Sequence, residues 1–401
     1  MTTLLLYDDA CARTFEPFAL TRPASELRAG ALLVRERWER AVGVRASGAV
    51  AAPHLADFED VGAPGVASGV ISAGTVVANA RCVPALAPLA SGAAVWRCGG
   101  RAAAVCLARD LPVTELADGS RTLEELAPRD APAADLRGRW LNAVWDLLAL
   151  LGDQLTDDIL ALGRELEPAR SAAGTIQMGE HPLFVERGAV VEPLACFDTT
   201  AGPVLIRREA RVHAFTRVVG PCYIGEHSTV IGDRIAGSSI GEHCKVHGEL
   251  STTVFLGYSN KSHDGFVGHS VLGRWSNLGA GTITSNLKNT YGPVQLWTPR
   301  GVRDTGLQFL GTLLGDHAKT GIGTRLTTGA VVGAGANVFG GAVCPKVVPP
   351  FAWGERPPYE TYRADKFVAV AERVMARRQV TLTERGRRYL SAVHAARWSA
   401  S

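Results

Sequence analysis

An aliphatic side chain recurs about every six positions through the second half of the chain, and this period constrains the fold more than any other feature. The positions are Ile206, Val212, Val218, Ile224, Val230, Ile235, Ile240 and Val246, and the repeat resumes at Leu278, Val332, Val338 and Val343. A helix repeats about every 3.6 residues and a strand alternates about every two, so neither produces this spacing. The pattern predicts hexapeptide coils that stack into a parallel β-helix, because stacked coils bury what a single coil cannot.

The rest of the chain divides by pattern as well. Short apolar runs at 66–87 and 92–108, followed by a helical period from Trp140 through Leu162, predict an α/β domain. A stretch of Pro, Ala, Ser and Gly from Glu165 to Gly174 predicts a linker. The predicted boundaries are 1–165 for the α/β domain, 175–350 for the β-helix and 351–401 for a C-terminal amphipathic helical arm.

Composition excludes several classes of protein. The apolar fraction of 46% and the charged fraction of 20% are those of a globular protein. The net charge of +3 is far from the basic excess of a nucleic-acid-binding protein, and no apolar run reaches membrane-spanning length. Met1 to Tyr7 lacks the features of a signal peptide, and the eight cysteines are scattered without metal-type spacing. We expect a cytoplasmic protein with no nucleic-acid or membrane partner.

The stretch from Gly257 to Tyr291 is the first candidate site. It collects lysines, histidines and asparagines among glycines, which makes it a poor core. Between Val246 and Leu278 the six-residue spacing drifts, and this predicts a loop or widened coil around Lys261 and His263.

A second candidate site lies near the N-terminus. Ser25 is positioned to cap a helix predicted over Ala31 to Arg40, and Arg22 and Arg28 would flank its entrance, where a phosphate is favoured. The spacing equally allows both arginines to pair with nearby glutamates on a solvated face. Those glutamates are Glu26, Glu36 and Glu39.

Several motifs together resemble a known family. They are Thr21-Arg22-Pro23 with Glu26-Leu27-Arg28, Gly202-Pro203-Val204, Asn260-Lys261-Ser262-His263-Asp264-Gly265-Phe266, Asn277-Leu278-Gly279-Ala280-Gly281-Thr282, Ser285-Asn286, Gly315-Asp316-His317 and Phe351-Ala352-Trp353-Gly354. The chain resembles bifunctional N-acetylglucosamine-1-phosphate uridylyltransferase / glucosamine-1-phosphate acetyltransferase, and more closely the bacterial sugar nucleotidyltransferase-like proteins related to it. This resemblance implies a nucleotidyltransferase-like α/β domain and a left-handed parallel β-helix that forms a homotrimer.

The resemblance also implies site residues in the β-helix. His263 falls on the family's proposed base, with His269 and His317 as competitors, and Asn277 and Asn286 fall on the residues that contact the sugar. Acetyl-coenzyme A would lie along the coils past Gly311 to Thr328. Its phosphates would be held by Lys319 and Arg325, although each is also explained as a solvated charge.

Two departures from the family bear on the acceptor. Phe266 stands where the family has a Tyr that reaches the phosphate, and a Lys of the preceding coil is replaced near Ser251. Lys261 and Lys288 are candidates to substitute electrostatically as substrate-binding residues, with a solvated rim as the alternative.

The N-terminal half departs further. Sugar nucleotidyltransferases carry a Gly-rich phosphate loop after the first strand, whereas Asp8 to Thr14 contains no glycine. A variant site would use Arg13, Arg22 and Arg28 with Mg²⁺. The metal ligands stay open, since Asp8, Asp9 and Asp146 have no persuasive spacing.

The expected function is therefore a transferase of nucleotide-sugar biosynthesis, of the kind that leads to UDP-N-acetylglucosamine. It would transfer a nucleotidyl group from a nucleoside triphosphate to a sugar 1-phosphate, and an acetyl group from acetyl-coenzyme A to an amino-sugar 1-phosphate. The alternatives are that one domain alone is active, or that the chain is a trimeric sugar-nucleotide-binding scaffold without turnover.

Overall fold

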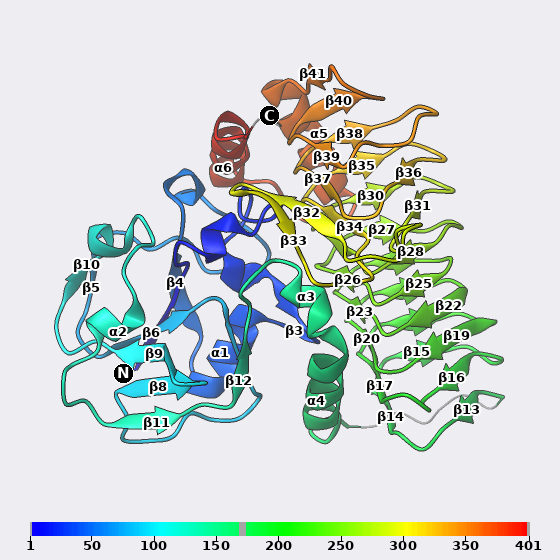
Figure 1. Cartoon of the computed structure of the whole chain (residues 1–401). Helices are drawn as coiled ribbons and strands as arrows, with labels where there is room; N and C mark the ends of the chain where they lie inside the picture. Colours follow the sequence, from blue (N-terminus) through cyan, green and yellow to red (C-terminus); the bar gives the residue numbers. More distant parts are fainter. Residues whose placement is uncertain (1, 168–173, 399–401) are drawn as a thin grey trace. The chain divides into compact units, whose positions relative to one another are not determined.

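The computed structural model of the chain describes residues 2–167 and 174–398 (Figure 1). Most of the predicted linker, residues 168–173, lies outside the described residues. The chain forms two compact units. The N-terminal unit comprises residues 1–144 and 380–396, and the β-helix unit comprises residues 145–379 and 397–401. The domain boundaries predicted from the sequence remain a proposal.

The N-terminal unit is built on a six-stranded sheet in the order β11-β8-β9-β6-β1-β4. Strand β1 lies parallel to both β4 and β6, and β9 runs antiparallel to β6 and β8. Leu5, Tyr7, Val50, Val77 and Val105 pack in its core. The sheet strands are β1 (Thr3–Tyr7), β4 (Ala46–Val50), β6 (Thr75–Asn79), β8 (Val95–Cys98), β9 (Arg101–Cys106) and β11 (Ala133–Asp135). Shorter pairs are β2 (Arg28–Ala29) with β3 (Leu32–Leu33), β5 (Val70–Ile71) with β10 (Leu111–Pro112), and β7 (Cys82–Pro84) with β12 (Gly138–Trp140).

Three α-helices belong to this unit, namely α1 (Val34–Val42), α2 (Leu123–Leu126) and α6 (Glu384–Ala395). The C-terminal helix α6 is held by Tyr389, whose hydroxyl donates to the carbonyl of Thr21 and whose ring meets Phe58 edge-on at 5.5 Å. Arg388 pairs with Asp57 at 3.0 Å. The predicted C-terminal arm is therefore two helices rather than one, and α6 packs with the N-terminal unit while α5 (Ala364–Ala376) belongs to the β-helix unit.

The coils of the β-helix unit form three sheets of parallel strands, and in the first coils each strand pairs with the third strand after it, as a coil with three sides requires (Figure 1). One strand at the end of the third sheet, Glu360–Thr361, is antiparallel to its neighbour. The first face contains β13 (Ile176–Met178), β16 (Cys196–Asp198), β19 (Thr216–Val219), β22 (Asp233–Ala236), β25 (Leu250–Ser251) and β28 (Val267–Gly268). The second face contains β14 (Leu183–Val185), β17 (Val204–Ile206), β20 (Cys222–Ile224), β23 (Ser239–Ile240), β26 (Val254–Phe255), β29 (Val271–Leu272), β34 (Thr312–Leu314), β37 (Ala330–Val332) and β39 (Val347–Val348).

The ten-stranded third face carries the site described below. It contains β15 (Val190–Val191), β18 (Arg211–Val212), β21 (Thr229–Val230), β24 (Lys245–Val246), β27 (Asn260–Lys261), β30 (Asn277–Leu278), β35 (Lys319–Thr320), β38 (Asn337–Val338), β40 (Ala352–Gly354) and β41 (Glu360–Thr361). Most of the repeating aliphatic residues of the sequence fill the interior, among them Val212, Val230 and Val246. Val343, the last residue assigned to the repeat, is instead 53% exposed. The prediction of an α/β domain, a parallel β-helix and C-terminal helices is confirmed.

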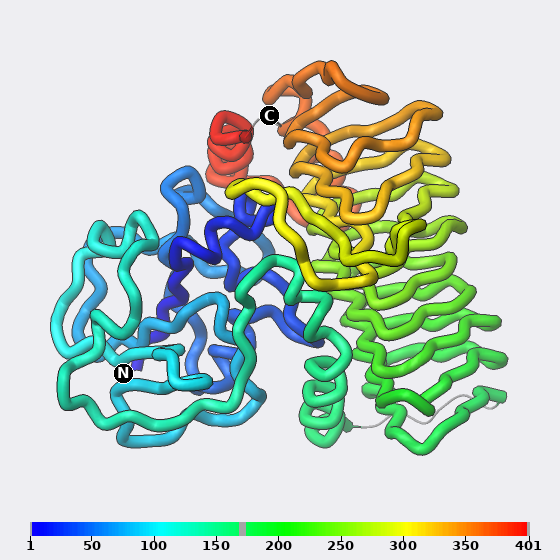
Figure 2. The backbone as a smooth tube through the Cα atoms, viewed as in Figure 1, coloured from blue at the N-terminus to red at the C-terminus, as the bar shows by residue number. Residues whose placement is uncertain are grey.

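The main interruption of the coils lies later than the sequence predicted. The corner at 262–266 is only slightly longer than the corner at 247–249 of the preceding coil. Residues 285–311 instead leave the stack as a large excursion, which Figure 2 shows in yellow. It contains an antiparallel hairpin of β32 (Gln295–Thr298) and β33 (Gly301–Asp304), flanked by the pair β31 (Ile283–Thr284) and β36 (Arg325–Leu326). The coils resume at once, because β34 pairs directly with β29.

The helix predicted from Trp140 begins later, because Trp140 ends strand β12. The helical segment is α3 (Asp146–Ala149) followed by α4 (Leu151–Gly163). Helix α4 packs on β17 and β20, and a Cβ at Gly163 would lie 2.3 Å from the ring of Phe184. Glycine at 163 is thus what lets the helix end lie against the first coils. None of the helices within the described residues is long and apolar enough to span a lipid bilayer.

Candidate functional site

A ladder of outward-facing residues runs along the ten-stranded face. Side chains alternate between the two faces of a strand, so the residue before each buried one points outward. The outward positions lie in register from one coil to the next. They are Thr229, Lys245, Asn260, Asn277, Lys319, Asn337 and Trp353.

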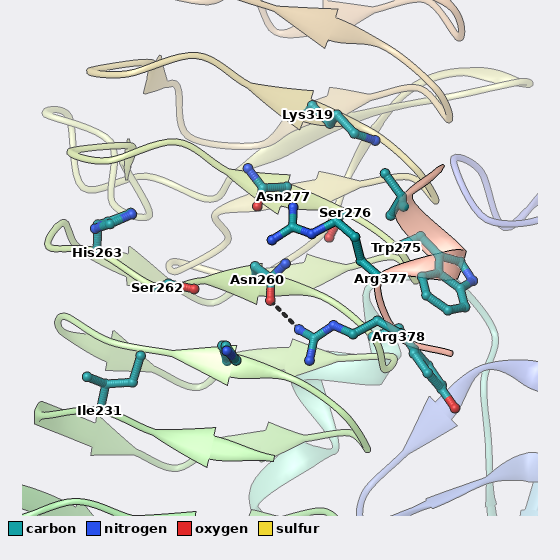
Figure 3. A pocket seen from close by; sticks show the side chains of 13 residues that line it. Ile231, Asn260, Ser262, His263, Trp275, Ser276, Asn277, Lys319, Arg377 and Arg378 are labelled. Carbon is teal, nitrogen blue, oxygen red and sulfur yellow. Dashed lines mark hydrogen bonds between the residues drawn. The ribbon is translucent and has the colours of Figure 1, made fainter. Parts of the chain in front are cut away.

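A cavity of about 660 Å³ lies over the middle of this ladder, against the C-terminal end of α5 (Figure 3). Figure 3 shows the side chain of His263 at one side of the cavity and those of Arg377 and Arg378 at the other, with Asn277 between them. The lining residues are Ile231, Lys245, Tyr258, Asn260, Ser262, His263, Trp275, Ser276, Asn277, Lys319, Val374, Arg377 and Arg378.

The cavity is strongly basic. Lys245, Lys319, Arg377 and Arg378 line it together with His263, and none of the described residues in its lining is acidic. The guanidinium of Arg378 donates to the side-chain oxygen of Asn260 at 2.7 Å. Burial lowers the pKa of Lys319 to about 8, and its ammonium donates to the carbonyl of His317 at 3.0 Å. Such a lining suits a ligand that carries several negative charges.

Aromatic rings form one wall of the cavity. Tyr258 and Trp275 stand at successive corners in the left-handed conformation, with φ of 55° and 61°, and their ring centroids are 4.3 Å apart. His243 stacks on the other side of Tyr258 at 4.6 Å, and burial, with the neighbouring charge of His227, lowers the pKa of His243. The guanidinium of Arg274 lies 4.8 Å from the centre of the Tyr258 ring. This stacked column gives the cavity a rigid wall.

The structure brings together three of the residues that the sequence singled out. His263, Asn277 and Lys319 line the same cavity although they lie on three different coils. The base and sugar roles predicted for His263 and Asn277 require that they share a site, and their positions are compatible with those roles.

Lys261 is placed differently from the expectation of a substrate-binding residue. Asn260 occupies the outward position of strand β27, so Lys261 points into the coil and is 0% exposed. Its ammonium donates to the carbonyl of His247 at 3.2 Å and to the carbonyl of His263. It is not among the described residues that line the cavity.

Asn286 and Lys288 belong to the excursion and not to the described lining of the cavity. The amide nitrogen of Asn286 contacts Nδ1 of His269 at 2.9 Å, and Phe309 stacks on the same imidazole at 5.2 Å. Burial lowers the pKa of His269. The ammonium of Lys288 donates to the carbonyl of Pro293 at 2.8 Å. These residues form a second cluster.

Arg325 lies on β36, outside the ten-stranded face, and its guanidinium donates to the carbonyl of Gly341. It is exposed and is not among the described lining residues of the cavity that contains Lys319. The two predicted phosphate-binding residues are therefore not brought together.

The N-terminal unit has a smaller cavity of about 200 Å³ at the carboxyl ends of β1 and β6. Asp9 lies at its centre, where Arg81 binds its carboxylate with distances of 2.6 and 2.8 Å and Asn79 donates to it at 2.9 Å. Burial raises the pKa of Asp9, but the hydrogen bonds and charge of Arg81 outweigh burial and hold this pKa below its usual range. Arg101 lies 3.9 Å from the centre of the Trp140 ring in the same cavity.

None of the three arginines predicted for this site is among the described residues that line the cavity. Arg13 donates to the carbonyls of Ala117 at 2.5 Å and Asp8 at 3.1 Å, and Arg28 donates to the carbonyl of Ala31 at 2.5 Å. Arg22 forms a buried ion pair.

Arg22 forms an ion pair with Asp60 at 3.0 Å, so of the two readings of this arginine the paired one is present. Asp60 was not among the partners predicted from the sequence. The helix cap predicted at Ser25 is absent, because α1 begins at Val34 and Leu33 precedes it. The Glu36 carboxylate accepts from the Leu33 amide at 2.9 Å in its place.

Asp8 and Asp9 do not fit a Mg²⁺ site. Both oxygens of Asp8 accept from the amide of Ala24, at 3.0 and 3.1 Å, and burial raises the pKa of Asp8 to about 7. Asp9 is neutralised by Arg81. Among the residues that the structure describes, the one group with metal-type proximity is Asp233, His247 and Asp264 in the β-helix unit. A magnesium ion needs free carboxylate oxygens, which Asp8 and Asp9 do not offer.

Several lining residues were missed by the sequence interpretation. Lys245 and Asn260 precede an inward position of the repeat, as Asn277 and Lys319 do, so the phase of the repeat could have identified them. No such signal exists for Arg377, because nothing in the sequence shows where helix α5 packs.

Parts of the chain match known proteins. Residues 4–165 match the family described as sugar nucleotidyl transferase. A bifunctional sugar-1-phosphate nucleotidylyltransferase/acetyltransferase from Sulfurisphaera tokodaii is 31% identical over 155 residues, which cover 35% of this chain and 36% of that protein. The bifunctional protein GlmU of Methanococcus vannielii is 30% identical over 127 residues, covering 31% of this chain and 28% of that protein.

The bifunctional protein GlmU of Methanococcus maripaludis matches a longer segment, with 25% identity over 214 residues that cover 52% of this chain and 45% of that protein. The chain spans less than half the length of each of these relatives. The resemblance inferred from the motifs is confirmed. Parts of the chain are thus similar to bifunctional sugar-1-phosphate nucleotidylyltransferase/acetyltransferases, and its residues 4–165 match the sugar nucleotidyl transferase family.

Proposed function

We propose that the β-helix unit is an acyltransferase that moves an acetyl group from acetyl-coenzyme A to the amine of an amino-sugar 1-phosphate. The observation that carries this proposal is the cavity in which His263 and Asn277 meet four cationic side chains without a carboxylate among the described lining residues. Both substrates carry phosphate groups, and a basic cavity beside a histidine suits them.

In the proposed reaction the neutral amine attacks the thioester carbonyl, and an amide bond forms as the carbon–sulfur bond breaks. His263 accepts the amine proton at an imidazole nitrogen and passes it to the departing thiolate. Its side chain is exposed at the edge of the cavity, so substrate can reach it. Histidine is the side chain that enzymes use most often as a general base.

The acceptor would lie between Asn277 and the end of α5. Asn277 and Asn260 offer hydrogen bonds to sugar hydroxyls, and Arg377 and Arg378 offer charge to the phosphate. Phe266 has no hydroxyl with which to bind the phosphate. In this arrangement the arginines of α5 bind the phosphate instead. Asn286 and Lys288 remain candidates to meet the sugar of a neighbouring subunit, since they lie on the excursion.

The acyl donor would extend from Lys319 along the outward ladder. Lys319, Asn337 and Trp353 lie in register on successive coils, about 5 Å apart. The ladder leads to a second cavity of about 350 Å³, which contains Trp353, Tyr362, Lys366 and Arg373. Aromatic rings beside cations suit the adenine and phosphates of coenzyme A. This path replaces the one predicted past Gly311 to Thr328, and it leaves Arg325 as a candidate contact from outside the ladder.

We further propose a cytoplasmic homotrimer. Four apolar side chains near the pair β31 and β36 are 39 to 81% exposed, as an interface with a second copy would require. They are Ile283, Ile322, Phe339 and Val343. Sedimentation equilibrium should give three times the chain mass of 42.4 kDa. A monomer at micromolar concentration would contradict this proposal.

A second candidate function is sugar-1-phosphate nucleotidyl transfer by the N-terminal unit, favoured by the family match over residues 4–165. A phosphate oxygen of the sugar would attack the α-phosphate of a nucleoside triphosphate and release pyrophosphate. Arg101 and Arg121 are the cations of the cavity nearest to solvent that could meet the phosphates. Magnesium would accompany the nucleotide, because Asp8 and Asp9 are engaged elsewhere. The scaffold without turnover is the remaining alternative.

The test is a screen of acetyl-coenzyme A and nucleoside triphosphates against hexosamine and hexose 1-phosphates. Thiol release and pyrophosphate release are measured separately, so each unit is judged alone. We expect thiol release that depends on an amino-sugar 1-phosphate. Binding of both ligands without release of either product would favour the scaffold and reject both reactions.

A further inference from the structure

Lys261 occupies a position that the β-helix otherwise gives to aliphatic residues. The inward positions of successive coils on the ten-stranded face are Val212, Val230, Val246 and Lys261. The lysine is 0% exposed, as are the three valines. Taking an ammonium out of water costs several kcal/mol, so a lysine in such a column needs compensating contacts.

Those contacts lie at the corner that carries His263. The Lys261 ammonium donates to the carbonyl of His247 at 3.2 Å and to the carbonyl of His263 itself. Gly248 makes room for it, because a Cβ there would lie 3.1 Å from the ammonium nitrogen and 2.7 Å from the carbonyl oxygen of Gly265. The ammonium thus joins two successive corners through their main chains.

Charged side chains hold the same corner from outside. The carboxylate of Asp264 lies 3.1 Å from Nδ1 of His247, and that of Asp233 lies 3.4 Å from Nε2 of the same imidazole. The carbonyl of Asp264 accepts from the amide of Gly281 on the next coil at 3.1 Å. Both nitrogens of His247 therefore face carboxylates. The corner at 262–266 is therefore held on three coils.

We propose that Lys261 is a positioning residue for acyl transfer, whose buried ammonium holds the main chain of His263 so that the imidazole stays at the cavity. The proposal rests on the proposed function, in which His263 is the base. Lys261 itself does not meet substrate. It fixes the distance between the base and the amine, and a misplacement of about 1 Å can cost about 100-fold in rate.

The proposal predicts that a substitution of Lys261 lowers activity without lowering stability. A methionine at this position keeps the volume of the lysine but needs no compensation for a buried charge. We expect Lys261→Met to fold with a Tm equal to or above that of the wild type. We also expect its kcat to fall between about tenfold and 100-fold, with the KM for acetyl-coenzyme A unchanged.

The experiment compares Lys261→Met with two further variants. Asp264→Asn weakens the same corner from its exposed side and should lower kcat by a smaller factor. Lys346→Met changes an exposed lysine of the same unit and should alter neither quantity. Hydrogen exchange of the amides of residues 262–266 gives a readout that does not depend on turnover. It should accelerate in Lys261→Met and stay unchanged in Lys346→Met.

The outcomes decide the two proposals separately. A native kcat in Lys261→Met, or a lowered Tm with a loss of activity in proportion, would show that the lysine is only structural. Unchanged exchange at 262–266 would overturn the positioning role even if no turnover were found in any variant. Full activity in His263→Ala would reject the proposed base while leaving the exchange result to be judged alone.

Discussion

The cavity that contains Asp9 and the cavity that contains Asn277 are both lined by arginines, but their charges are arranged in opposite ways. In the N-terminal unit Arg81 is bound by Asp9, Arg121 pairs with Glu115 at 3.0 Å, and Arg101 lies over Trp140. In the β-helix unit no carboxylate is among the described lining residues. An arginine with an internal partner stabilises the fold, whereas one that faces a cavity is available to a ligand. We therefore expect charge to contribute more to ligand binding in the β-helix cavity than in the N-terminal cavity.

The largest expected effect is on the base of the β-helix cavity. His263→Ala should lower kcat for acetyl transfer by about 100-fold to 10,000-fold, the usual contribution of a general base. The rate of thiol release under saturating substrates measures it. His181→Ala, at an exposed histidine of the first coils, is the matched control and should keep full activity. If both variants were equally active, the β-helix cavity would be rejected as the site of acetyl transfer.

The next effect tests the internal pairing of the N-terminal unit. Arg22→Ala removes the partner of Asp60, and both side chains are less than a tenth exposed. The free energy of unfolding should fall by about 3 to 5 kcal/mol, as for other broken buried pairs. Urea denaturation measures it. The Arg45–Glu39 pair is the control, because Arg45 is 86% exposed and Arg45→Ala should cost less than about 1 kcal/mol.

An unchanged stability in Arg22→Ala would reverse the interpretation of this arginine. It would favour the original expectation that Arg22 binds a phosphate, and pyrophosphate release should then be impaired in a folded protein.

A smaller effect concerns the acceptor. Arg378→Ala removes a charge from the cavity together with the hydrogen bond to Asn260, and it should raise the KM for the amino-sugar phosphate by about tenfold to 100-fold. The kcat should change little. Arg234→Ala, at an exposed arginine on the first face of the same unit, is the control. If only the KM for acetyl-coenzyme A rose, Arg378 would be assigned to binding of the acyl donor and not of the acceptor.

The smallest effect is a pH dependence. Burial lowers the pKa of Lys319 to about 8, so its ammonium loses its proton as the pH rises from 7 to 9. The protonated form attracts the phosphates of the donor, so affinity for coenzyme A should fall over this range. The dissociation constants of wild type and Lys319→Met for coenzyme A, measured by calorimetric titration, should converge toward pH 9. If the affinity for coenzyme A changed equally with pH in both proteins, Lys319 would be excluded as the titrating group.

The sequence predicted the architecture of the β-helix well, because a repeat leaves a periodic signal. It failed where the chain is aperiodic. Residues 285–311 contain a hairpin that obeys no hexapeptide spacing, and the sequence interpretation placed the interruption near His263 instead.

Site residues were predictable for a similar reason. His263 and Asn277 stand in a motif, and the phase of the repeat carries Asn277 outward. The same phase places Lys261 at an inward position. Its charge suggests the opposite, because charged side chains are mostly exposed. The packing of α5 and α6 on different units was not predictable, since an amphipathic pattern shows that a helix is covered but not by what.

The excursion at 285–311 begins and ends at the same place. The amide of Leu310 donates to the carbonyl of Asn286 at 2.9 Å, and that of Gly311 donates to the carbonyl of His269 at 2.8 Å. The coil therefore closes across the base of the excursion. Hydrogen bonds at this closure, rather than a short connection in the sequence, therefore hold the neighbouring coils in register.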